Sequence, residues 1–156
     1  MPIVAAAIAA LVAVAGYLYD RGNKRRDDLR TLFSEALAAV ADYQELPYRI
    51  RRRSDMSPMT PSDIAARGGD IQIRLDLFTA RLQLETGDLA DAFVTLVDAV
   101  RAESGIQMSE AWRQPRIASD EEMPLGSAYP RPRSDAARTQ CIEVMQKYLR
   151  SWASRR

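Results

Sequence analysis

The chain has 156 residues, with 22 lysines and arginines against 21 aspartates and glutamates, so its formal net charge is +1. A charge so close to balance does not point to nucleic acid as a partner. Histidine is absent and cysteine occurs once, which excludes an internal disulfide, a histidine general base and histidine-containing metal sites. We therefore expect a protein without a cofactor and without enzymatic activity.

The first distinctive element is an apolar stretch at residues 3–19, which carries no charged side chain. Its seventeen residues would form a helix about 25 Å long, the short end of what crosses a bilayer. Four basic residues follow it directly: Arg21, Lys24, Arg25 and Arg26. The pattern predicts a transmembrane anchor over residues 1–20, with the N-terminus outside the cell and the rest of the chain in the cytoplasm. The basic residues would also favour anionic lipid headgroups.

Two alternatives to an anchor remain open for this stretch. Residues 13–15 resemble the small-residue cleavage site of a signal peptide, although no lysine or arginine precedes the apolar run as such a peptide requires. A helix that is apolar on all sides is also found in the core of some soluble proteins. We prefer the membrane anchor because the basic cluster stands directly at its inner end.

Small residues recur every four positions in the apolar stretch, at Ala5, Ala9 and Ala13. Such spacing lets two membrane helices approach closely, so we consider homo-oligomers formed through this face. The same face supports an alternative function, that of a phage-type membrane-active protein that acts in exclusion or lysis.

The next periodic segment covers residues 24–53. Apolar residues recur every seven positions and again three positions later, which predicts an amphipathic helix. Gly22 and Asn23 are the expected site of a bend, and Pro47 should kink the helix or end it near Leu46. The expected buried residues are Leu29, Leu32, Ala36, Ala39, Tyr43, Leu46 and Ile50.

A second soluble helix is expected over residues 61–85, because Thr60 and Pro61 form a good start signal. Residues 70–77 alternate between polar and apolar, which is typical of a strand. We prefer a helix, because no second convincing strand exists to pair with this one. The apolar face of the helix would comprise Ile64, Ile71, Leu75, Phe78 and Leu82.

The third soluble helix is expected over residues 89–103, with Gly105 ending it. Residues 105–133 contain four prolines and are expected to form a surface linker. A last helix should follow Ser134 and run to about Ala153, with Cys141, Met145, Tyr148 (or Leu149) and Trp152 on its buried face. The predicted organisation is a transmembrane anchor (1–20), a helical hairpin core (21–104), a Pro-rich linker (105–133) and a C-terminal helix that packs on the core (134–156).

The fold class is thus all-α, with an N-terminal transmembrane helix followed by a small antiparallel bundle or stacked helical hairpins. The apolar start, the basic segment and the stretches 32–53 and 80–101 together resemble a loose group of small proteins from high-GC Gram-positive bacteria and their phages. These proteins have one membrane helix and a helical domain. The resemblance implies a bacterial membrane protein and brings no catalytic residues.

Two basic segments are candidate contact sites. The first comprises Arg49, Arg51, Arg52 and Arg53, because clustered guanidinium groups bind phosphates on lipid or nucleic acid; the alternative is a solvated helix end that favours cations. The second is the Pro/Arg/Tyr stretch at residues 128–133, which is either a docking segment for a partner or a plain linker. Cys141 is expected to be a buried, inert thiol.

The function expected from these patterns is that of a non-enzymatic, single-pass membrane protein with a cytosolic helical interaction domain. Its partners would be the membrane itself and either another copy of the chain or a second membrane-associated protein.

Overall fold

The computed structural model describes residues 2–53, 59–117, 119, 122 and 129–154. For some helical residues only the backbone is described, namely residues 2–12, 15, 18, 59 and 152–154. The described residues contain no strand. Their helices are α1 (Pro2–Gln44), α2 (Leu46–Arg51), α3 (Met59–Glu85), α4 (Gly87–Arg113) and α5 (Pro132–Ser154).

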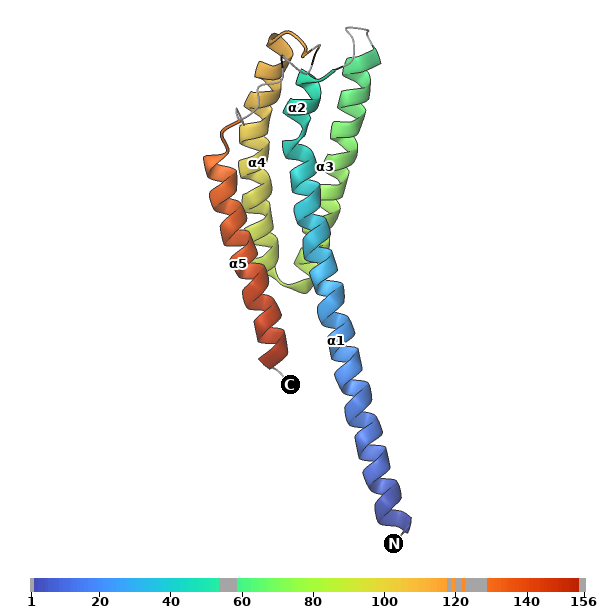
Figure 1. The fold of residues 1–156 in the computed structure, drawn as a ribbon. Helices are drawn as coiled ribbons and strands as arrows, with labels where there is room; N and C mark the ends of the chain where they lie inside the picture. The colour runs from blue at the N-terminus through green and yellow to red at the C-terminus, as the bar shows by residue number, and fades with distance from the viewer. Residues whose placement is uncertain (1, 54–58, 118, 120–121, 123–128, 155–156) are drawn as a thin grey trace.

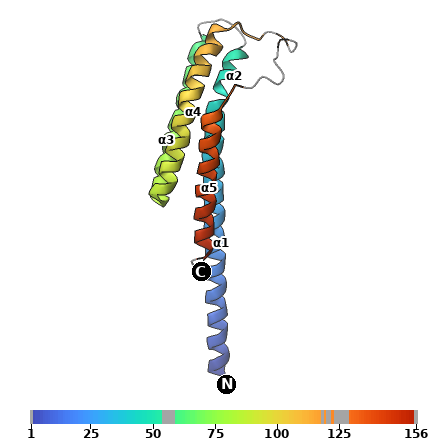
Figure 2. The same cartoon turned by 90° about the vertical axis from the view of Figure 1, so that its left-hand side faces the viewer.

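The helices form an elongated bundle from which the N-terminal half of α1 projects (Figures 1 and 2). The second half of α1 packs against α3, α4 and α5, while α2 packs on α3 and α4. Helix α3 and helix α5 lie on opposite sides of the bundle (Figure 1), and the Tyr148 hydroxyl of α5 donates a hydrogen bond to Glu85 at the end of α3 at 3.2 Å. The prediction of an all-helical bundle is confirmed.

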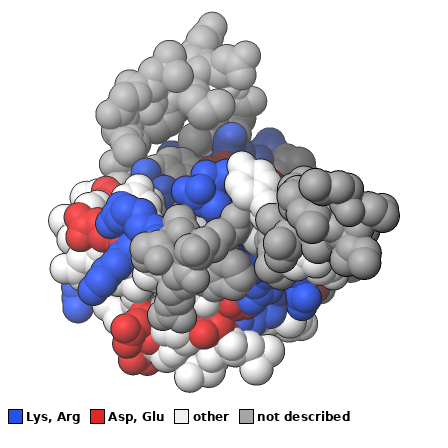
Figure 3. All heavy atoms as spheres, turned by 90° about the horizontal axis from the view of Figure 1, so that it is seen from below, with Lys and Arg blue, Asp and Glu red and all other residues white. Residues whose placement is uncertain are grey.

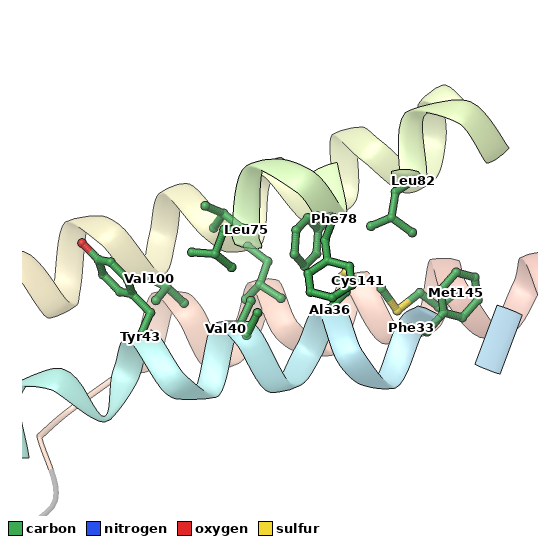
Figure 4. Close-up of a cluster of buried hydrophobic side chains, with 14 of the residues drawn as sticks. Phe33, Ala36, Val40, Tyr43, Leu75, Phe78, Leu82, Val100, Cys141 and Met145 are labelled. Carbon is green, nitrogen blue, oxygen red and sulfur yellow. The ribbon is translucent and has the colours of Figure 1, made fainter. Parts of the chain in front are cut away.

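The core lies between the second half of α1 and the inner faces of α3, α4 and α5 (Figure 4). Phe93 on α4 is part of this core and is fully buried. Every residue of the seven-residue pattern predicted for 24–53 is buried, which confirms that pattern. The α3 and α4 residues that join them are Ile71, Leu75, Phe78, Leu82, Leu89, Phe93, Leu96 and Val100, with Cys141 and Met145 from α5.

The chain breaks between α1 and α2 where the proline predicts it. Helix α1 ends at Gln44, and α2 begins at Leu46 with Pro47 in its first turn. A proline is tolerated there because the first amides of a helix have no intrahelical acceptor. The bend expected at Gly22 does not interrupt α1, which continues through it as a helix.

Residues 70–77 are helical within α3, so the strand alternative is wrong and the preferred helix is confirmed. Thr86 then caps α4: its backbone is extended, and its hydroxyl accepts a hydrogen bond from the Asp88 amide at 3.1 Å. This cap lets the chain reverse direction in a very short turn, so α3 and α4 pack side by side.

The expected end of the third soluble helix at Gly105 is wrong, because α4 continues to Arg113. Its buried positions continue beyond Val100 at helical spacing, through Ser104, Gln107 and Ala111. Two of these residues are polar, which hid the period in the sequence. The core segment therefore extends past residue 104, and residues 105–113 belong to it rather than to the Pro-rich linker.

In the part of the chain that the structure describes, no helix has both the length and the apolar character needed to cross a membrane. Most of the predicted span, residues 3–19, has side chains outside the described residues, and Ala5 and Ala9 are among them. Ala13 is described and is exposed. The membrane anchor remains a prediction.

Replacing Phe93 with alanine should lower the free energy of unfolding by about 3–5 kcal/mol, because it leaves a cavity in a closely packed core. Ile106→Ala, at a site 73 % exposed on the same helix, should change it by less than about 0.5 kcal/mol. Urea unfolding of the full chain in detergent, followed by circular dichroism, measures both. Equal losses for the two variants would contradict this assignment of the core.

Candidate functional site

The four arginines predicted as a contact patch do not share one surface. Arg53 is only 6 % exposed. Its guanidinium group donates hydrogen bonds to the carbonyl oxygens of Ile50 at 2.8 Å and Gln114 at 3.1 Å. The same group lies 5.3 Å from the ring centroid of Trp112, close enough for a cation–π contact. Arg53 therefore joins the end of α2 to the end of α4 and is not available as an exposed contact.

Arg51 and Arg52 are also engaged within the molecule. The Arg51 side chain donates a hydrogen bond to the Pro115 carbonyl, and the Arg51 carbonyl accepts one from the Ile117 amide at 2.8 Å. Arg52 pairs with the Glu45 carboxylate. The first two contacts hold residues 115–117 against α2, so part of the predicted linker is docked on the bundle.

Arg49 lies apart from the other three, in a cleft of about 380 Å³ between α1, α2 and α3. Arg74 crosses this cleft and donates a hydrogen bond to Asp42 at 2.7 Å. Because the charged residues of the lining cancel, the cleft offers no net charge to attract an ion. These residues are Asp42, Asp63 and Asp70 with Arg49, Arg67 and Arg74.

The second candidate segment, residues 128–133, has Tyr129 and the residues after it docked on the protein's own bundle; residue 128 lies outside the described residues. The Tyr129 amide donates to the Tyr48 hydroxyl at 3.0 Å, and the two rings meet edge to face with centroids 5.1 Å apart. The Pro130 carbonyl accepts a hydrogen bond from Gln107 at 2.9 Å. A contact that the sequence suggested for a partner's groove is thus made internally.

A small polar cluster fixes the start of α5 against α1 and α4. Gln44, only 3 % exposed, donates to the Ser134 hydroxyl at 3.2 Å and accepts from Arg138 at 3.2 Å. Glu103 accepts from the backbone amides of Arg133 at 2.8 Å and Ser134 at 3.1 Å. Burial raises the pKa of Glu103, but these hydrogen bonds outweigh it and leave the pKa below its usual value.

The Gln44 cluster was not foreseen from the sequence, because glutamine and serine residues at these positions carry no periodic signal. Buried polar groups of this kind are costly unless each finds a partner. The cluster therefore specifies how α5 sits on the bundle rather than forming a binding site.

Of the four basic residues after the apolar stretch, Arg26 is half-buried, and the other three divide into two groups. Arg25 forms an ion pair with Glu85, in which one guanidinium nitrogen lies 2.5 and 2.6 Å from the two carboxylate oxygens. This pair joins α1 to the end of α3. Arg21 and Lys24 have exposed side chains. Seen from the end at which α1 protrudes, basic and acidic side chains intermingle over the surface (Figure 3). Arg21 and Lys24 are thus the residues of this group best placed to meet a charged surface.

Cys141 is 1 % exposed and lies on the buried face of α5 (Figure 4), which confirms the prediction of a buried thiol. Burial raises the pKa of its thiol to about 11. The thiol is the protonated, weakly nucleophilic form at neutral pH.

Among the described residues, no three side chains of the types that bind metals gather at one place. No family model, no curated protein and no solved structure matches this chain. The resemblance to small bacterial and phage proteins therefore stays a prediction, and arguments about function rest on the residues themselves.

Replacing Arg53 with methionine should lower the free energy of unfolding by about 1–3 kcal/mol, because it leaves buried carbonyl oxygens without donors. Arg52→Met removes an exposed pair and should cost less than about 1 kcal/mol. Urea unfolding of both full-length variants gives the comparison. If Arg52→Met is the more damaging change, Arg53 does not join α2 to α4.

The Cys141 thiol should react with an aromatic disulfide reagent at pH 8 at least about a hundredfold more slowly in the folded protein than in urea. The cause is the raised pKa together with burial. Absorbance of the released thiolate follows both reactions. Similar rates in the two states would show that α5 does not stay packed on the core.

Proposed function

We propose that this protein is a non-enzymatic, single-pass membrane protein whose helical bundle is an interaction domain on the cytosolic side. The observation that carries the proposal is the continuity of α1, a single helix of 43 residues. At about 1.5 Å per residue it is roughly 65 Å long, enough for a membrane anchor and one helix of a bundle. Its first half is apolar in sequence, and its second half supplies core residues.

The residues at the junction support the same arrangement. Tyr17 and Tyr19 are 64 % and 63 % exposed, and tyrosine is enriched where a membrane helix meets water. The exposed Arg21 and Lys24 follow within five residues. In this order, the aromatic residues would lie at the headgroups and the basic residues just inside.

The mechanism would be local concentration. An anchor that is continuous with the bundle holds the bundle upright at a fixed distance from the bilayer. Confinement to the membrane then raises the effective concentration of any partner anchored in the same bilayer. The two arginine-containing segments, residues 49–53 and 129–133, make mainly internal contacts. A partner would therefore bind to other exposed faces of the bundle.

The anchor is tested by extracting native membranes with carbonate. The wild-type chain should stay with the membranes, whereas the Leu11→Arg, Val14→Arg double variant should be largely released, because each charge in a helix centre costs about 2.5–3.5 kcal/mol. Ile106→Arg, an exposed site on α4, is the matched control and should stay bound. Loss of the wild-type chain to the wash would refute the proposal.

Orientation is tested on the same membranes with a reporter fused to the C-terminus. A reporter that is active only in the cytoplasm should be active here. Activity of a reporter that works only outside the cell would reverse the proposed topology.

A further inference from the structure

Helix α3 has apolar residues on the face that points away from the core. Ile73, Leu77 and Leu84 are 69 %, 54 % and 87 % exposed, and the exposed Ala80 lies between the last two. The steps of four, three and four residues place these side chains in one row along the helix. The core residues of α3 lie on the opposite face. Single exposed leucines are ordinary, but a row of them marks a contact surface.

The row follows the pattern of a coiled-coil seam. Leu77 and Leu84 occupy the first apolar position of the seven-residue repeat, and Ile73 and Ala80 occupy the second. We propose that two copies of this chain associate side by side through this face of α3, with the two α3 helices parallel and in register.

Charge on the two flanks of the row favours the parallel arrangement. Asp76 lies on one flank, and Arg74 and Arg81 lie on the other. In a parallel pair, a residue on the Asp76 flank of one helix faces the residue five positions later on the opposite flank of the other helix. Asp76 would therefore meet Arg81 of the second copy. In an antiparallel pair, equivalent flanks meet, and arginines would face arginines.

Both flanking charges remain accessible for such a contact. Asp76 accepts a hydrogen bond from Arg101 at 3.1 Å, yet its side chain is 73 % exposed. Arg81 lies 3.7 Å from Glu35, and its side chain is 46 % exposed. A carboxylate can accept from two donors at once, so the contact between copies does not require either internal pair to break.

The membrane anchor imposes the same geometry, and this step rests on the proposed function. Helix α3 packs against α1 (Figure 1), so the direction of α3 relative to the bilayer follows from the direction of α1. Two copies inserted in the same sense are related by a rotation about the membrane normal. Such a rotation keeps their α3 helices parallel and produces a self-complementary contact.

The seam is short, because the repeat is broken on its N-terminal side: the position seven residues before Leu77, where the repeat needs an apolar residue, holds Asp70. Coiled coils in water generally need three or four repeats. We therefore expect weak association in dilute detergent and strong association in the membrane, where confinement raises the effective concentration.

Disulfide crosslinking of the full-length chain in native membranes tests the arrangement, and the buried Cys141 is left in place. Ile73→Cys should crosslink to Ile73→Cys, and Leu84→Cys to Leu84→Cys. Ile106→Cys, equally exposed on α4, should not crosslink. Membranes that contain both Ile73→Cys and Leu84→Cys chains, one of them tagged, should yield no mixed dimer. Preferential mixed dimers would indicate antiparallel helices and overturn the proposal.

Charge reversal tests the flanking pair. In a Leu77→Cys background, Asp76→Arg or Arg81→Asp alone should lower the crosslinked fraction roughly fivefold, and the two together should restore it. Circular dichroism checks that each variant is folded. Failure of the double variant to recover, in a folded protein, would overturn the parallel register.

Two further outcomes separate this proposal from the proposed function. If the chain resists carbonate but the α3 cysteines crosslink no more than Ile106→Cys, the anchor stands and the α3 contact is refuted. A polarity-sensitive dye on Leu84→Cys distinguishes a lipid surface from a second copy. If the dye reports an apolar environment in vesicles at one chain per vesicle, α3 contacts lipid and the proposal is refuted.

Discussion

One apolar face of α1 organises the whole bundle. Its residues from Leu29 to Tyr43 share one buried cluster with residues of α3, α4 and α5, and the helix packs on all three. The same helix continues without a break into the apolar N-terminal stretch. Whatever holds that stretch therefore also holds the bundle, and it does so through a stiff rod rather than a flexible tether.

At the end of the bundle that holds α2, polar contacts hold the helices together, as apolar packing does at the centre of the bundle. Arg53 joins α2 to α4, and Gln44 with Ser134 seats the start of α5. These groups are buried, and a buried donor or acceptor left without a partner is costly. Their geometry is therefore specific, and the basic segment that resembled a binding patch serves mainly to hold helix ends together.

Helix α3 has apolar residues on two opposite faces. Leu75 and Leu82 point into the core, whereas Leu77 and Leu84 are exposed. This double pattern also explains why residues 70–77 alternate like a strand, because two helical stripes on opposite faces superimpose to give a period near two. The ambiguity in the sequence and the exposed seam have one cause.

The sequence by itself determined that the chain is helical, where its main helices lie and which residues fill the core, because the 3.6-residue period of apolar side chains is a local property. It also indicated the break at Pro47. Only the tertiary structure decided that α4 passes Gly105, that Arg53 is buried and that residues 115–117 and 129–131 dock on the bundle. Those features depend on partners 23 to 87 residues away in the chain, and a pattern along the chain carries no information about which distant polar groups will meet.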